Sequence, residues 1–100
     1  MLSLGCWNIK GLNAPHKQDE VFAIVNLHKI SLMGLLETRV QCSKSPQLAR
    51  QTLLGWETLF NYDELPGGRI WIAWNPDILK VQSLYVSSQI IHTKMTVRKN

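Results

Sequence analysis

The sequence is poor in cysteine and has no long hydrophobic run, and each absence excludes a class of protein. Its two cysteines, Cys6 and Cys42, form no C-x-x-C pair and are too few for a disulfide framework. We therefore expect an intracellular protein with reduced thiols, in which Cys6 is a small core residue of an apolar strand. No apolar run approaches the roughly 20 residues that span a bilayer, and MLSLG is unlike a signal peptide. We expect no membrane partner.

Acidic residues are absent from 78–100, although this segment contains Lys80, Lys94, Arg98 and Lys99. The whole chain of 100 residues has a net charge of +4. A basic segment favours polyanions, because each phosphate that it neutralises releases counterions. Charge alone does not identify nucleic acid as the partner, and a solvated basic surface fits the same residues. Both interpretations stay open at this point.

The order of apolar and polar segments predicts one small α/β domain, or part of a larger one. Residues 2–8 form a short apolar run that is typical of a strand covered on both faces. Apolar residues on one helical stripe predict a helix over 17–29, and a second strand follows over 30–37. Strand, helix and strand in this order favour a βαβ unit with parallel neighbours and a right-handed crossover.

Shorter elements follow this βαβ start. Pro46 and Gly55 bracket an expected short helix at 46–54. Alternating segments separated by turn residues then predict strands at 56–60, 69–74, 78–86 and 89–97. The expected architecture is a βαβ start followed by mainly antiparallel strands, with helices on at least one face of the sheet.

Two polar residues end the two strands of the βαβ unit. Asn8 ends the first strand and Glu37 ends the second, so both belong at the carboxyl edge of a parallel pair, where open α/β sheets bind ligands. A carboxylate after the apolar run LMGLL is costly to bury without a partner. A carboxylate beside an amide suits Mg²⁺. The alternative is that Glu37 is a solvated surface residue and that Asn8 caps a turn.

Four motifs occur in a fixed order along nearly all of the chain: CWNIKGLN, KQDEV, LMGLLET and GGRIWIAWNP. Together they resemble the endonuclease/exonuclease/phosphatase (DNase I-like) superfamily. They are most similar to the endonuclease domain of LINE-type (non-LTR) retrotransposons. The resemblance implies that 1–100 is the N-terminal half of a two-sheet α/β sandwich. It also implies a DNA partner and, for a functional protein, a nuclear location.

The resemblance assigns roles to residues at the same edge. It implies that Asn8 orients the scissile phosphate and the active-site water, and that Glu37 ligates a divalent metal ion, usually Mg²⁺. Asn13 is expected to fix the loop through side-chain to backbone hydrogen bonds. Lys10 stands where repair endonucleases often have an acid, and we expect Lys10, Asn13 and Arg39 to lie near nucleic acid.

The remaining catalytic motifs of the family are missing from these 100 residues. There is no GDFN-type strand and no SDH-type end, and no Asp is placed to orient His16, His28 or His92 as a general base. The implied function is that of a truncated, inactive remnant of a Mg²⁺-dependent DNA endonuclease. Two alternatives stay open: a non-catalytic basic nucleic-acid-binding fragment, and a decayed reading frame without a selected function.

A half-domain also has structural consequences. It would supply one sheet whose inner face lacks its partner, so we expect Trp71, Ile90 and Met95 on a partly exposed apolar surface, with self-association through that sheet. The four tryptophans could stack on unpaired bases, but their positions in or beside strands favour core and sheet roles: Trp7, Trp56, Trp71 and Trp74.

Overall fold

The computed structural model describes residues 2–62, 70–87 and 89–98. In chain order, its elements are β1 (Leu4–Asn8), α1 (Pro15–Leu27), β2 (Leu32–Leu36), the 3-10 turn η1 (Cys42–Lys44), α2 (Ser45–Thr52), β3 (Glu57–Phe60), β4 (Ile70–Trp74), β5 (Leu79–Val86) and β6 (Ile91–Val97). This mixture confirms the α/β class. The described element boundaries lie within two residues of those expected from the sequence, and Arg69, expected in a strand, lies outside the described residues.

Helix α1 is shifted toward the N-terminus relative to the expected 17–29. Proline at the first helical position needs no hydrogen-bond partner for its nitrogen, so the helix begins at Pro15. At the other end, Lys29 has a φ of 52° and the Ile30 nitrogen donates to the Val25 carbonyl at 2.9 Å. Because Ile30 belongs to this helix-ending turn, strand β2 begins at Leu32 and not at residue 30.

The first sheet has the strand order β1-β2-β4-β3. Strands β1 and β2 are parallel, with Asn8 opposite Leu36, which confirms the expected βαβ unit. Strand β4 is antiparallel to both β2 and β3. The two loops after β1 and β2 therefore leave the sheet at the same edge.

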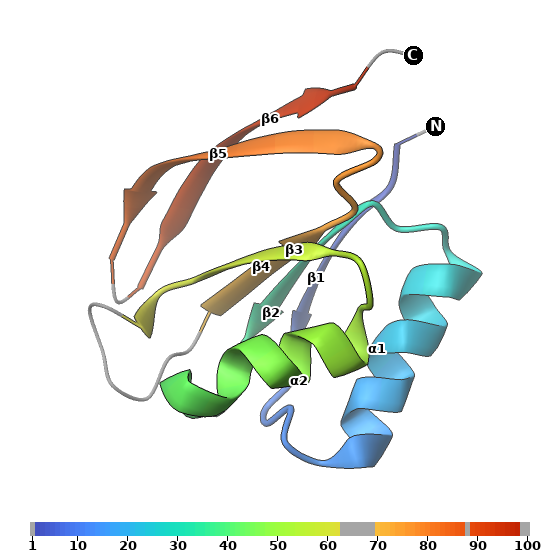
Figure 1. Ribbon diagram of the computed structural model, residues 1–100, viewed down its shortest axis with the longest axis vertical. Coiled ribbons are helices and arrows are strands. Elements are labelled where there is room, and N and C mark those ends of the chain that lie inside the picture. The colour runs from blue at the N-terminus through green and yellow to red at the C-terminus, as the bar shows by residue number, and fades with distance from the viewer. Residues whose placement is uncertain (1, 63–69, 88, 99–100) are drawn as a thin grey trace.

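Strands β5 and β6 form a separate two-stranded antiparallel sheet, so the prediction of a single sheet was wrong. A turn after β4 redirects the chain. The Leu79 nitrogen donates to the Asn75 carbonyl at 3.0 Å, and the Asp77 nitrogen donates to the Asn75 side-chain oxygen at 3.0 Å. Figure 1 shows α1 and α2 on one side of the first sheet and the β5–β6 hairpin on the other.

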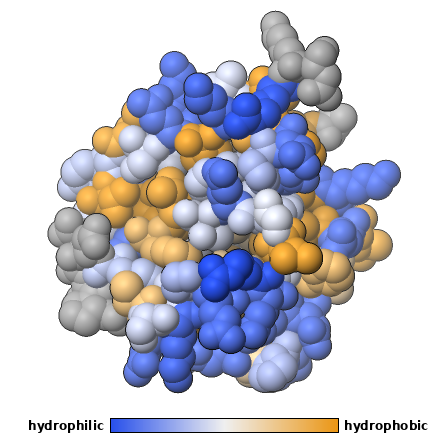
Figure 2. All heavy atoms as spheres, viewed as in Figure 1, coloured by the Kyte–Doolittle hydropathy of each residue, from blue (hydrophilic) through white to orange (hydrophobic). Residues whose placement is uncertain are grey.

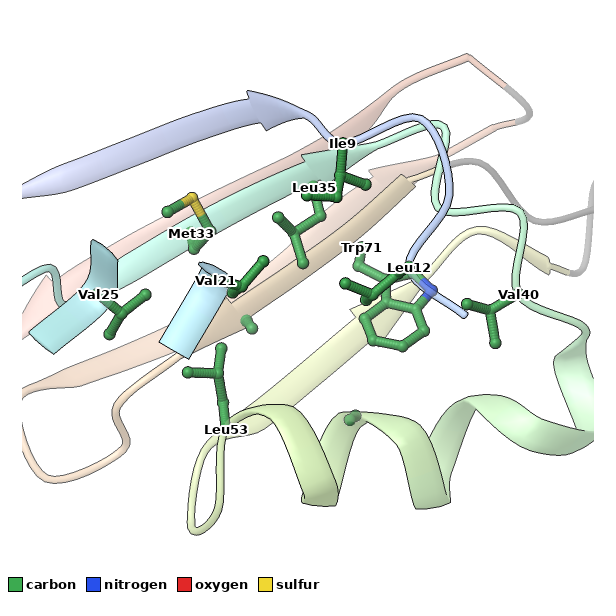
Figure 3. Packing of buried hydrophobic residues seen from close by; sticks show 11 residues of the cluster. Ile9, Leu12, Val21, Val25, Met33, Leu35, Val40, Leu53 and Trp71 are labelled. Carbon is green, nitrogen blue, oxygen red and sulfur yellow. The ribbon is translucent and has the colours of Figure 1, made fainter. Parts of the chain in front are cut away.

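The main hydrophobic core lies between the two helices and the first sheet (Figure 3). Met33 and Leu35 point into it from β2, and Val21 and Val25 reach it from α1. Trp71 is 1% exposed in this core. The expectation that Trp71 lies on an exposed apolar surface was therefore wrong, because its position in the β4 register places it on the helix-covered face. None of the four tryptophans is exposed, which agrees with the core and sheet roles that their positions in or beside strands favoured.

The opposite side of the first sheet, here called the far face, is only partly covered. Along β1, Leu4, Cys6 and Asn8 are exposed, whereas Gly5 and Trp7 are half-buried. The prediction of a strand covered on both faces was wrong, because β1 is an edge strand with helices on one side only. For the same reason Cys6 is exposed and is not a core residue.

Apolar side chains also reach the surface of the hairpin. Ile90 is 53% and Met95 is 39% exposed, which confirms the expectation for these two residues. Figure 2 shows apolar side chains at the surface in several separate groups and not as one continuous face. The hairpin is therefore much less well covered than the first sheet.

Candidate functional site

The candidate site consists of the two loops that follow β1 and β2. Hydrogen bonds of 2.8–3.0 Å join the loops: the nitrogens of Ile9, Gly11 and Leu12 donate, in order, to the carbonyl oxygens of Leu36, Glu37 and Thr38. These bonds continue the pairing of the parallel strands beyond the sheet. The positions of Asn8 and Glu37 are thereby fixed relative to each other.

Buried apolar side chains anchor both loops to the hydrophobic core. Ile9 and Leu12 are 1% and 0% exposed, and Val40 is 1% exposed in the loop after β2. Figure 3 shows these three side chains reaching the core near Trp71. Alternation between buried and exposed residues then leaves Asn8 and Lys10 at the surface. The apolar residues of the motif WNIKGLN therefore hold its polar residues outward.

The backbone at this edge contains an unusual group of left-handed residues. Lys10, Glu37 and Arg39 have φ values of 52°, 54° and 56°, and Gly11 has a φ of 106°. A non-glycine residue in this region costs about 1–2 kcal/mol, and such residues concentrate at functional sites. Sequence reasoning missed this feature, since only Gly11 signals a positive φ.

The two proposed ligand side chains have no partner in the described part of the chain. Asn8 is exposed and Glu37 is half-buried. Across residues 2–62, 70–87 and 89–98, neither side chain forms a hydrogen bond or ion pair. Because a carboxylate that has lost part of its solvent favours a cation or a donor, this edge is suited to bind a ligand.

Asn13 links the two loops instead of closing its own turn. Its side-chain nitrogen donates to the Arg39 carbonyl oxygen at 2.9 Å, which agrees with the loop-fixing role expected for Asn13. Gln18 of α1 adds a bond that the sequence did not reveal, from its side-chain nitrogen to the Leu12 carbonyl oxygen at 3.0 Å. Lys10 and Arg39 are both exposed on this loop pair, as contacts to phosphate would require.

The residues fit a weakly held Mg²⁺ ion. In the described part of the chain, no group of three or more His, Cys, Asp and Glu residues is placed to hold a metal ion. Mg²⁺ does not need such a cage, because it keeps several waters and binds through one or two carboxylates together with phosphate oxygens. Glu37 could supply one carboxylate, and Asn8 lies opposite Leu36, the residue before Glu37, in the strand register.

Beneath this edge lies a buried polar network that sequence reasoning missed. The Trp71 indole nitrogen donates to the Tyr62 hydroxyl at 2.9 Å, and that hydroxyl donates to the Val40 carbonyl oxygen at 2.8 Å. Burial raises the pKa of Tyr62, so the phenol remains protonated and able to donate. Through the Val40 carbonyl, this network fixes the loop that follows Glu37 to the core. In the sequence, Asn61 and Tyr62 look like ordinary turn residues.

Comparisons with known proteins do not extend these observations: no family model and no curated protein matches the chain. Within the residues that the structure describes, neither helix has the length and apolar character needed to cross a membrane.

Proposed function

We propose that this chain carries the metal- and phosphate-holding part of a Mg²⁺-dependent phosphodiesterase site of the DNA endonuclease type found in LINE retrotransposons. One observation carries the proposal. Asn8 ends β1 and Glu37 directly follows its parallel neighbour β2. The two loops are joined by hydrogen bonds, and neither side chain has a partner in the described chain. The motifs WNIKGLN and LLET, which supply these loops, support the choice of this family.

Each residue at the edge has a distinct role in this proposal. The Glu37 carboxylate holds the ion, and the Asn8 amide donates a hydrogen bond to a phosphate oxygen and so orients the phosphate. Lys10 and Arg39 attract the DNA backbone as exposed cations of the same loop pair. When bound, Mg²⁺ would polarise a phosphate oxygen and stabilise charge on the leaving oxygen.

The same proposal holds that these 100 residues do not hydrolyse DNA. In-line attack needs a base that takes a proton from water and stands within hydrogen-bond reach of it. The sequence contains neither the Asp-x-Asn of a GDFN-type strand nor the Asp–His pair of an SDH-type segment. The chain binds ion and phosphate but leaves water unactivated, which is the behaviour of an endonuclease remnant.

Ion binding is tested on the whole chain by recording its two-dimensional amide NMR spectrum during titration with Mg²⁺. A second titration uses Mn²⁺, whose unpaired electrons broaden nearby signals. We expect shifts and broadening centred on Asn8, Glu37 and Thr38. Glu37→Gln should abolish both effects. Glu57→Gln is the matched control, because Glu57 is exposed at the start of β3, at the edge of the sheet opposite to Glu37.

Two results would overturn the proposal. One is equal broadening in the wild type and in Glu37→Gln, which would show that Glu37 does not hold the ion. The other is nicking of supercoiled plasmid by the purified chain with Mg²⁺, which would disprove its lack of hydrolysis.

A further inference from the structure

The β5–β6 hairpin has one face that is polar, exposed and rich in hydrogen-bonding groups. Cross-strand neighbours share a face of a sheet, and the register pairs Lys80 with Thr96 and Gln82 with Lys94. All four side chains are exposed, and they line a shallow groove of about 220 Å³. We call this side of the hairpin the outer face. The opposite, inner face carries the buried Leu79 and the half-buried Ile91.

A β-bulge adds an aromatic ring to the outer face. Strict alternation would put Tyr85 on the inner face with Leu79 and Val81. The register shifts between Ser83 and Tyr85, so that Tyr85 pairs with His92. His92 alternates with Lys94, and both rings are therefore on the outer face. Bulges are known to redirect side chains in this way, and Tyr85 is 59% exposed here.

The charge on this face is of one sign. Lys80 and Lys94 lie diagonally across the two strands, and residues 78–100 contain no acid. Arg98 continues the row, with its side chain fixed by a 2.6 Å bond from Nε to the Pro76 carbonyl oxygen. The row from His92 to Arg98 spans about 20 Å at the rise of an extended strand. Within the described chain, no internal partner occupies Lys80, Lys94, Tyr85 or His92.

We propose that the outer face binds single-stranded nucleic acid, with Lys80 and Lys94 on the phosphates and Tyr85, beside His92, stacked on a base. This combination of a cationic groove and aromatic rings is the general means of binding unpaired strands. In a duplex the base faces are already stacked on one another, so Tyr85 gains a contact only with a single strand. The proposal is independent of Asn8, Glu37 and any metal ion.

The test measures the fluorescence anisotropy of a labelled twelve-nucleotide oligo-dT mixed with the whole chain, in EDTA and at 50–200 mM salt. We expect binding that weakens about sevenfold across this range, because two neutralised phosphates on a single strand give a slope of about −1.4. A duplex of equal length should bind more weakly than oligo-dT. Glu37→Gln should bind oligo-dT as tightly as the wild type, which separates this site from the metal site.

Two matched pairs of variants locate the binding. Lys80→Gln/Lys94→Gln should remove most of the affinity and flatten the salt dependence. Lys17→Gln/Lys29→Gln removes the same charge from α1 and the turn that follows it, and should have little effect. Tyr85→Ala should weaken binding about fivefold or more, and Tyr85→Phe should restore it. Amide spectra confirm that each variant folds.

Three results would overturn the proposal. The first is the absence of oligo-dT binding at 50 mM salt. The second is an equal loss of affinity in both lysine pairs, which would indicate attraction to overall charge. The third is a Tyr85→Ala variant that binds as well as the wild type, which would remove the stacking contact.

Discussion

The two sheets of this molecule differ sharply in how their apolar side chains are covered. In the first sheet, Met33, Leu35 and Trp71 are 1–2% exposed beneath two helices. In the hairpin, Leu84, Ile90 and Val97 are 51–53% exposed. Since hydrophobic stabilisation scales with the apolar area removed from water, the first sheet holds most of the folding free energy. The hairpin depends on its attachment to that sheet, because isolated two-stranded hairpins are marginal in water.

Two buried residues of the described chain, Asn61 and Leu79, contribute to this attachment. Asn61 directly follows β3 and is fully buried. Its side-chain oxygen accepts a hydrogen bond from the Ile70 nitrogen of β4 at 3.0 Å. Its side-chain nitrogen donates to the carbonyl oxygen of Ser87, directly after β5, at 3.2 Å. At the other end, Leu79 is 0% exposed. The difference between the sheets predicts that damage to the first sheet unfolds the whole molecule, whereas damage to Asn61 releases mainly the hairpin.

The largest effect is expected for Trp71→Ala. The substitution leaves a cavity in the main core and removes the edge-on contact with the Phe60 ring, whose centroid lies 5.0 Å away. Such truncations cost about 3–5 kcal/mol, a large part of the stability of a domain of this size. Urea unfolding would measure the loss. Leu54→Ala is the control, because Leu54 is 84% exposed and should change stability by less than about 0.5 kcal/mol.

Asn61→Ala should cause the next largest loss of stability, and the loss should be greater in the hairpin than in the first sheet. The Ile70 nitrogen and the Ser87 carbonyl each lose a partner, which costs about 2–3 kcal/mol in total. Amide hydrogen exchange should then accelerate across β5 and β6 far more than across β1 and β2. Asn26→Ala, which removes an exposed bond to Phe22, is the control. Uniform acceleration in all strands would contradict the independence of the two sheets.

Tyr62→Phe tests the polar network below the candidate site. It leaves the Trp71 indole nitrogen and the Val40 carbonyl without their partner, at about 1–2 kcal/mol. Burial raises the pKa of Tyr62 above 10.0, although hydrogen bonds with Trp71, Ser45 and Thr38 act the other way. The native state therefore keeps this proton to higher pH than the unfolded chain, and its contribution is complete below pH 10 and lost as pH rises further.

Unfolding measured from pH 9 to 11 distinguishes this contribution from other titrations. The free energy of unfolding of the wild type should fall more steeply than that of Tyr62→Phe, which has no phenol to ionise at this position. Parallel curves would show that Tyr62 does not carry the alkaline sensitivity.

The spacing of apolar residues and the positions of turn-forming residues were sufficient to predict much of the first sheet. The apolar runs around Cys6 and Gly34 gave the βαβ unit, and strand-end position placed Asn8 and Glu37 at one edge, because parallel strands leave a sheet on the same side. The sequence of one strand does not reveal which strands and helices pack against it. Whether Cys6 is covered depends on where the helices lie, and Trp71 was misplaced for the same reason.

Sequence position was sufficient to predict where the polar residues of the candidate site lie, but not which contacts support them. Alternation gives no sign that Lys10, Glu37 and Arg39 adopt positive φ, since none is glycine. The bond from Asn13 to Arg39 spans 26 positions, and the Tyr62 hydroxyl reaches Val40 across 22. Such contacts follow from tertiary packing, and local sequence patterns carry no information about them.

Two glycines on opposite faces of the first sheet provide the smallest and sharpest comparison. A Cβ on Gly5 would stand 3.1 Å from the Met33 sulfur and 3.2 Å from Ile30 Cδ1, so Gly5→Ala should overpack the helix-covered face at about 1 kcal/mol. A Cβ on Gly34 would stand 3.8 Å from Cys6 Sγ on the far face. There Gly34→Ala should raise stability by about 0.4–1 kcal/mol, because it restricts the unfolded chain. Urea midpoints that shift in opposite directions would confirm that only one face is tightly packed, whereas equal losses would show that the far face is packed as tightly as the core.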